Sequence, residues 1–282
     1  MTVQNLYTET LLRAERQGEA LPSFNIFNQQ SLRGVLAAVR ESGRPVILQP
    51  STGTVKRIGA VALKSMIRGE LSSLETPVLL HLDHCKDLDL ARLCIDEGWD
   101  SVMVDFSHLP LEENIEKTQI IVAYAHPRNV AVEGEVGVIS GVEDDIRSDV
   151  QHLASFEDTL RFIQQTGVDA VAPACGTAHG HYKSEPCLNY DLIRRLHEAS
   201  KTALVLHGGT GLTERQFLEM IACGITKINL STVLKEVWYD ALTEHLPRHD
   251  IASPMKVDIA AEEAFRKTAL SFIRLFSAGS KQ

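Results

Sequence analysis

The sequence lacks an excess of positive charge, and it lacks any long uninterrupted apolar run. Its 282 residues carry a formal net charge of −9, whereas proteins that bind nucleic-acid phosphates present basic surfaces. No apolar run reaches the roughly 20 residues that a helix needs to cross a bilayer. These absences argue against a nucleic-acid partner and against a membrane protein. A local basic pocket for a small anion is still allowed.

The N-terminus also lacks the features of a secretory signal. The segment MTVQNLYTETLLRAERQGEA is polar and patterned like an amphipathic helix, without a basic region followed by an apolar core. The five cysteines are an odd number with no framework spacing, so we expect no disulfides and a cytoplasmic protein. No low-complexity segment or linker divides the chain, which predicts one domain over residues 1–282.

Short apolar runs alternate with segments of helical spacing along the chain. At 44% hydrophobic residues the chain can bury one large core. Most of the runs are continuous rather than alternating, which is typical of strands covered on both faces. They are PSFNI, PVILQ, PVLLHLD, SVMVD, VAVEGEV, AVAPA, ALVLHGG and KINL. Eight strand–helix units predict an α/β fold, the (β/α)₈ TIM barrel, with a doubly wound open sheet as the alternative.

Polar residues and glycines follow each predicted strand, where a barrel of this kind builds its active site. Three histidines, His84, His179 and His207, follow the third, sixth and seventh strands. Imidazoles that converge from separate strands form a three-histidine site typical of catalytic zinc. The alternative is ordinary structural histidines. His81 lies earlier in its strand, and we expect it to pack or to hydrogen-bond behind the site.

Glycines beside hydroxyl groups predict a phosphate site. Backbone N–H groups approach an anion closely at glycine, and a helix N-terminus adds a favourable dipole. Ordinary turn chemistry is the alternative. The candidates lie at the ends of the first two strands, in GTAHGHYK, in HGGTG and after the eighth strand: Asn25, Ser51, Gly180, Lys183, Gly208, Gly209, Thr210, Asn229, Ser231, Thr232 and Lys235.

Carboxylates accompany the histidines. Asp83 adjoins His84, and Glu133 and Glu135 share one face of their predicted strand. The segment GVISGVEDD contains two glycines and reads as a loop that could carry one of its three acids toward a metal. A run of three acids is more often a solvated surface.

Taken together, these motifs resemble the class II, zinc-dependent ketose-bisphosphate aldolases, and most closely the tagatose-bisphosphate aldolase-like members. The resemblance covers nearly the whole chain, through HLDHC, SVMVDFSHLPLEENI, VEGEVGVISGVEDD, GVDAVAPACGTAHGHYKSEP, LVLHGGTGL and KINLST. It implies a barrel that cleaves a ketose 1,6-bisphosphate or a related ketose 1-phosphate. The products would be dihydroxyacetone phosphate and an aldehyde such as glyceraldehyde 3-phosphate.

The resemblance also assigns roles to residues. It implies His84, His179 and His207 as zinc ligands, Asp83 as the acid/base at the C4 hydroxyl, and Glu143 as the residue that exchanges the C3 proton. It implies Asp105 and Glu135 at an alternate metal position, and a Na⁺ or K⁺ ion near carbonyls of the histidine loops. The residues that would surround dihydroxyacetone phosphate are Gly180, Lys183, Gly208, Thr210, Asn229 and Thr232. Family members form homo-oligomers, so we expect a dimer or a tetramer.

The segment after the eighth strand departs from the pattern of fructose-bisphosphate aldolases. Where those enzymes carry N-x-D-T-D-x-R, this chain reads NLSTVLK, with Ser231, Val233 and Lys235 in place of two aspartates and the arginine. Lysine grips a phosphate less specifically than arginine does. Fructose 1,6-bisphosphate is therefore not the expected main substrate, and the aldehyde half is left open.

Three other functions fit parts of the sequence. A metal-dependent epimerase or isomerase uses similar chemistry on the same barrel, and a non-catalytic accessory barrel would need none of it. A Schiff-base aldolase would need a reactive lysine, for which Lys227 is the candidate near a late strand. Retention of the three histidines with Asp83 and Glu143 favours the metal-dependent aldolase.

Overall fold

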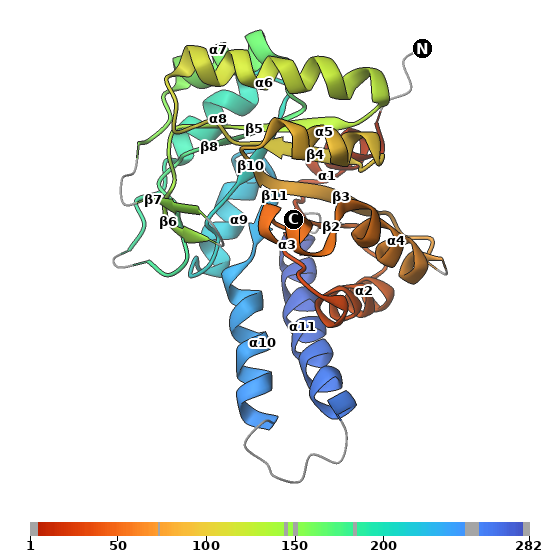
Figure 1. The fold of residues 1–282 in the computed structure, drawn as a ribbon. Helices are drawn as coiled ribbons and strands as arrows, with labels where there is room; N and C mark the ends of the chain where they lie inside the picture. The colour runs from red at the N-terminus through yellow and green to blue at the C-terminus, as the bar shows by residue number, and fades with distance from the viewer. Residues whose placement is uncertain are drawn as a thin grey trace.

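The computed structural model describes residues 5–72, 74–143, 146–148, 152–182, 185–245 and 254–278. Eight parallel strands close into a barrel in the order β1-β11-β10-β8-β5-β4-β3-β2, and helices surround them (Figure 1). The barrel strands are β1 (Leu21–Phe24), β2 (Val46–Leu48), β3 (Val78–Cys85), β4 (Ser101–Val104), β5 (Ala131–Val136), β8 (Ala170–Pro173), β10 (Ala203–Leu206) and β11 (Ile225–Leu230).

The predicted barrel is confirmed, and each of the eight predicted strands overlaps one barrel strand. These strands are buried along nearly their whole length. The side chains face either the barrel interior or the surrounding helices, so neither face needs polar residues. This burial explains why the sequence shows continuous apolar runs instead of alternation.

The helices follow the predicted alternation. They are α1 (Leu6–Arg16), α2 (Gln29–Ser42), α3 (Thr52–Ile58), α4 (Ala60–Leu71), α5 (Leu88–Asp96), α6 (Leu111–Ala125), η1 (His126–Arg128), α7 (Phe156–Thr166), α8 (Tyr190–Ala199), α9 (Glu214–Ala222), α10 (Thr232–His245) and α11 (Pro254–Phe276). Local signals set their ends. Asn28 and Ser31 form a capping box at the start of α2, and Gly43 ends that helix with φ 64°.

A small sheet beside the barrel departs from the sequence expectation. Residues 137–145 were expected to form a loop, but Ser140–Glu143 is strand β6, antiparallel to β7 (Ile146–Ser148). Strand β6 also pairs in parallel with β9 (Ala178–His179). The periodicity of so short a segment does not reveal pairing with a distant strand.

Helix α1 closes the end of the barrel opposite the predicted site. Tyr7, Leu11 and Ala14 are buried in a cluster with barrel residues that include Ala131, Ala170, Ala172 and Ala203. Small side chains at these positions leave room for the ring of Tyr7 inside the barrel. The predicted N-terminal helix therefore fills one end of the interior.

The last two helices lie side by side and extend away from the barrel (Figure 1). Helix α11 packs closely on α2, where Gly34 allows the two backbones to approach. A Cβ atom on Gly34 would lie 2.4 Å from the Phe265 Cβ, which is closer than van der Waals contact. Among the described residues, no helix combines the length and the apolarity that a membrane span requires.

Candidate active site

Three histidines meet at the barrel mouth. His84 lies in β3, His179 in β9, and His207 directly after β10. One ring nitrogen from each lies within 4.8 Å of the others, and all three side chains are buried. The Nε2 atom of His84 is buried without a hydrogen-bond partner among the described residues. The structure thus brings together the three histidines that the sequence singled out.

The backbone at His84 explains how two adjacent residues reach one site. Neighbouring residues of a strand normally point to opposite faces. His84 has φ 42°, a left-handed conformation that is uncommon outside glycine, and the β3–β4 register shifts between Leu82 and Cys85. This irregularity lets Asp83 and His84 both contact residues of the same polar cluster.

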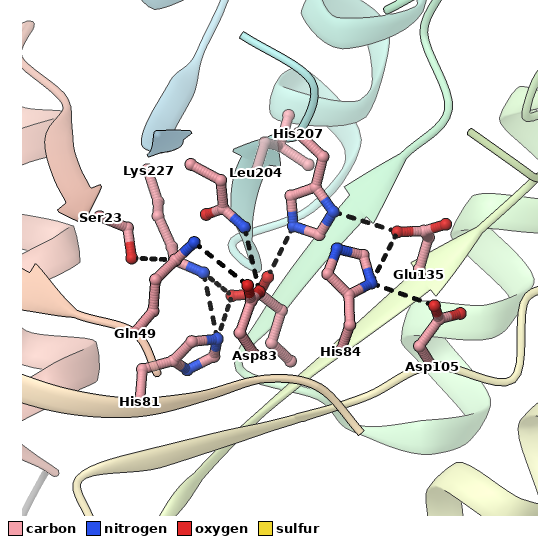
Figure 2. Close-up of polar contacts among 12 residues, drawn as sticks. Ser23, Gln49, His81, Asp83, His84, Asp105, Glu135, Leu204, His207 and Lys227 are labelled. Carbon is pink, nitrogen blue, oxygen red and sulfur yellow. Dashed lines mark hydrogen bonds and ion pairs between the residues drawn. The ribbon is translucent and has the colours of Figure 1, made fainter. Parts of the chain in front are cut away.

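Two buried carboxylates lie on one side of His84. Its Nδ1 is 3.0 Å from the Asp105 Oδ2 and 3.9 Å from the Glu135 Oε2 (Figure 2). The Ser107 Oγ lies 2.7 Å from the Asp105 Oδ1 and 3.1 Å from the Glu135 Oε1, so its one hydrogen is shared between the two acids. His84, Asp105 and Glu135 form a second group that could hold a metal ion. Ser107 thereby fixes the spacing of two candidate ligands.

His207 lies between two glutamates. Its Nδ1 is 3.1 Å from the Glu135 Oε2, and its Nε2 is 3.1 Å from the Glu133 Oε1. Burial alone would lower the pKa of His207, but hydrogen bonds to Glu133 and Glu135 raise it. Burial likewise opposes charge on His84, but Asp83, Asp105 and Glu135 outweigh it and raise the pKa of His84 to about 10. Both imidazoles thus lie in a negative environment.

Asp83 is held by side-chain amides. Its Oδ2 accepts from the Asn25 Nδ2 at 3.0 Å and from the Gln49 Nε2 at 3.5 Å. The Asn229 Nδ2 lies 3.5 Å from its Oδ1. Gln49 also donates to the Asn25 Oδ1 at 2.6 Å and accepts a hydrogen bond from Ser23. Because Gln49 is fully buried, this network orients Asp83 from the side opposite His84 and His207 (Figure 2).

Most of the predicted phosphate-binding residues surround the same end of the barrel. The Ser51 backbone bridges to Asp83, and Gly180 directly follows β9. Gly208 to Thr210 follow His207, and Thr232 begins α10. The Asn229 Oδ1 and the Ser231 Oγ are buried without a hydrogen-bond partner among the described residues. These polar atoms and the N-terminus of α10 together could receive an anion.

Two predicted site residues cannot be placed in full. Glu143 ends β6, but its side chain lies outside what the structure describes, and Lys183 lies outside the described residues altogether. Lys235 lies on α10 and is partly buried. The expected loop around Glu143 is in fact occupied by β6 and β7, and three residues separate β6 from β5.

Sequence reasoning missed three residues of this site. Gln49 ends the run PVILQ just as Asn25 ends its own strand, and that position was a usable signal. Ser107 comes two residues after the run SVMVD, so its position was a usable signal as well. Lys227 was considered only as a nucleophile, whereas its amine is fully buried and lies 2.7 Å from the Glu133 Oε2. The expected role of His81 is confirmed, because it hydrogen-bonds to Ser101 and Lys227.

Residues 5–281 match the family described as "Fructose-bisphosphate aldolase class-II". The chain belongs to this family. It is therefore a class II aldolase, a lyase, and its substrate is a sugar phosphate. This membership decides against the epimerase, the accessory barrel and the Schiff-base enzyme.

Proteins that are similar in sequence or in structure are named aldolases. A fructose-bisphosphate aldolase of Geobacillus stearothermophilus is 35% identical over 277 residues, covering 97% of this chain and 96% of that protein. A 6-phospho-5-dehydro-2-deoxy-D-gluconate aldolase of Halalkalibacterium halodurans is also 35% identical, with the same coverage. The solved YdjI aldolase of Escherichia coli K12 superimposes with a TM-score of 0.86 at 29% identity, covering 97% of both chains.

Proposed function

We propose that this aldolase uses a zinc ion held by His84, His179 and His207. The reaction would be the reversible cleavage of a ketose 1,6-bisphosphate of the tagatose or fructose type, or of a related ketose 1-phosphate. The products would be dihydroxyacetone phosphate and an aldehyde. The observation that carries the proposal is the convergence of three buried imidazoles beside a carboxylate, Asp83.

The residues at the barrel mouth fit a divalent cation. The His84 Nε2 has no hydrogen-bond partner in the part of the chain that the structure describes. This part of the interior also holds four buried carboxylates, Asp83, Asp105, Glu133 and Glu135. Lys227 neutralises one of them. An excess of buried negative charge is costly unless a cation compensates it. Three nitrogen donors suit zinc and leave coordination positions for a substrate.

Zinc bound there would act as a Lewis acid on the C2 carbonyl and stabilise the negative charge that develops when the C3–C4 bond breaks. We assign the accompanying proton transfer to Asp83. Its carboxylate would accept the proton of the C4 hydroxyl as that bond breaks, and return it in the condensation direction. Asn25 and Gln49 donate to this carboxylate and so aim it at one position, which is the requirement for general base catalysis.

A second group must protonate C3 after cleavage. We assign this role to Glu143, which the family resemblance implies. The support from the fold is the pairing of β6 with β9, which attaches the strand of Glu143 to the strand of His179. The proton donor and a metal ligand would then move together.

The acceptor half of the substrate is the open question. The relatives at 35% identity are named for a sugar bisphosphate and for a phosphorylated sugar acid. In this chain Ser231 and Lys235 replace the aspartate and the arginine of the fructose enzymes, and the buried Ser231 Oγ lacks a partner among the described residues. We propose that dihydroxyacetone phosphate is the constant product and that residues 231–235 select the aldehyde.

Coupled condensation assays test the reaction. Metal-free protein is reloaded with zinc and incubated with dihydroxyacetone phosphate and a panel of aldehydes that carry a phosphate, a carboxylate or neither. We expect zinc-dependent carbon–carbon bond formation with at least one aldehyde. Activity that resists chelators and is trapped by borohydride would contradict the proposal.

A matched pair of variants tests the metal ligands. His179→Ala should lose zinc and activity, whereas His181→Ala should keep both. His181 lies two residues further on, is mostly exposed and pairs with Glu236 on α10. Equal zinc content in the two variants would argue against His179 as a ligand.

Three further proposals rest mainly on the resemblance. We propose that residues 1–282 work as one barrel domain and that a Na⁺ or K⁺ ion binds carbonyls near His179 and His207. We also propose a homo-oligomer, either a dimer or a tetramer. Exposed apolar side chains on α10 and α11, Tyr239, Met255 and Ile259, support this assembly, and light scattering of the purified protein would measure its mass.

A further inference from the structure

Glu133 has no place in the reaction described above, yet it is among the most enclosed charges in the protein. Its side chain is fully buried. The Oε2 atom lies 2.7 Å from the Lys227 Nζ and 3.3 Å from the Tyr7 hydroxyl, and the Oε1 lies 3.1 Å from the His207 Nε2. The carboxylate thus joins a candidate metal ligand to the polar groups behind it.

Lys227 fixes the hydrogen-bond directions of this cluster. An ammonium group only donates hydrogen bonds, so His81, whose Nε2 lies 3.2 Å from the Lys227 Nζ, must accept there. The other nitrogen of His81 faces the Ser101 hydroxyl. Tyr7 of α1 stacks on the His81 ring at 5.7 Å between centroids. Figure 2 shows Lys227 and His81 on one side of His207 and Glu135 on the other.

These contacts determine which nitrogen of His207 is available to a metal. Glu133 is paired with an ammonium group and accepts from it, so its free oxygen acts as an acceptor toward His207 as well. The His207 Nε2 therefore carries the hydrogen. In the metal-free protein the Nδ1 atom donates to Glu135. When a metal binds, Nδ1 is the nitrogen that gives up its hydrogen and offers its lone pair. A carboxylate behind a ligating histidine generally fixes both the tautomer and the ring orientation.

Stability alone does not account for such a cluster. A buried ion pair pays a large desolvation penalty, and apolar residues of similar size often serve a fold as well. We propose that Glu133, held in place by Lys227 and Tyr7, is a positioning residue that orients His207 and selects its Nδ1 for the metal. This inference rests on the zinc site proposed above.

Zinc affinity measured by chelator competition on the metal-free protein is the first test. Glu133→Gln keeps the shape of the side chain and removes its charge, so zinc binding should weaken about 10- to 100-fold. Tyr7→Phe removes the 3.3 Å hydrogen bond from the Tyr7 hydroxyl to Glu133 and leaves the Lys227 contact, so its effect should be at most a few-fold. An unchanged zinc affinity in a folded Glu133→Gln protein would overturn the proposal.

A second variant distinguishes the loss of the positioning role from a loss of stability. Glu133→Gln leaves the Lys227 ammonium buried without its partner, which can destabilise the barrel. The double variant Glu133→Gln/Lys227→Met removes both charges together. If it melts near the wild-type temperature and still binds zinc weakly, the positioning role is supported. If it binds zinc as tightly as the wild type, the proposal is wrong.

The wild-type protein offers a spectroscopic test that a merely structural role would not pass. Long-range ¹H–¹⁵N correlation spectra of the zinc-loaded protein report which ring nitrogen of each histidine is protonated. We expect a protonated Nε2 on His207, and a protonated Nδ1 would overturn the inference. A wild-type protein that does not bind zinc through His84 would refute the proposed metal site itself, which separates the two failures.

Discussion

Gly141 and His179 are register partners in the small sheet beside the barrel mouth. Gly141 has φ +117°, and a Cβ atom there would lie 2.1 Å from the His179 carbonyl oxygen. The strand that carries Glu143 therefore contacts the backbone of a candidate metal ligand. Only a residue without a side chain permits that approach.

Gly141→Ala should therefore disrupt the active site, although Gly141 contributes no side chain to it. The new methyl group must displace either β6 or His179, and misplacement by about 1 Å can cost on the order of 10²-fold in rate. We expect a large fall in kcat together with weaker zinc binding. Gly69→Ala is the control, because a Cβ there meets nothing within 4 Å and the change to alanine favours a helix by about 0.5–1 kcal/mol. Equal activity in both variants would refute the coupling.

Asp83→Asn should separate chemistry from metal binding. The amide keeps nearly the same shape but cannot accept the C4 hydroxyl proton, so kcat should fall on the order of 10²–10⁴-fold while zinc content stays at the wild-type level. Asp87→Asn is the matched control, since Asp87 is exposed and caps α5, a role that asparagine also fills. Its other side-chain contact is a surface ion pair with Lys56, which contributes little. Near-normal turnover of Asp83→Asn would remove Asp83 from the mechanism.

Gln49→Leu tests the amide network around Asp83. The change leaves the Asn25 Oδ1 without its donor in a buried site, which costs about 1–3 kcal/mol of folding free energy. Asp83 also loses a donor, so kcat should fall while zinc affinity holds. Urea unfolding and steady-state kinetics measure the two effects. Gln119→Leu, on the exposed surface of α6, removes only a hydrogen bond to the Gln165 carbonyl and should leave kcat unchanged. Unchanged kcat in Gln49→Leu would show that the network does not orient the base.

The ion pair between His126 and Asp169 should make stability depend on pH. The hydrogen bond from His126 to Asp169 raises the pKa of His126 above its usual value. The contribution of this ion pair to the unfolding free energy is therefore fully present below about pH 6.5, the pKa of histidine in the unfolded chain. It is lost as the pH rises through the higher pKa that His126 has in the folded protein. Because the side chain is 41% exposed, solvent screening limits the contribution to below about 1 kcal/mol.

His126→Gln isolates this contribution. The difference in unfolding free energy between wild type and variant, measured in urea, should be larger at pH 5.5 than at pH 8.5. Protonation of the buried active-site groups is common to both proteins and cancels in the difference. A difference that is the same at both pH values would mean that the pair with Asp169 has no pH-dependent effect on stability.

Most of the site residues that could be predicted from the sequence lie at the ends of strands. Parallel strands end at one rim, so any polar residue just after an apolar run becomes a candidate for the site. This rule found His84, His207 and Asn229, and it would have found Gln49 as well. The rule works because the order of the strands along the chain determines their order around the barrel. It therefore requires no knowledge of side-chain packing.

That rule could not predict contacts between segments that are distant in the sequence. Alternation placed Glu133 and Glu135 on one face, but it could not show that they contact opposite nitrogens of His207. Nor could it show Tyr7, from the first helix, reaching Glu133 through the barrel interior. The β6–β7 hairpin was missed because its partner strand, β9, lies more than 30 residues further along the chain and has only two residues.

The left-handed backbone at His84 also limits how this site could be moved to another protein. A designer who copied His84, His179, His207 and Asp83 onto the strand ends of a regular barrel would obtain Asp83 and His84 on opposite faces. The φ of 42° at His84 and the register shift before Cys85 would have to be copied as well. An attempt to transplant this chemistry must therefore begin with the backbone of residues 82–85.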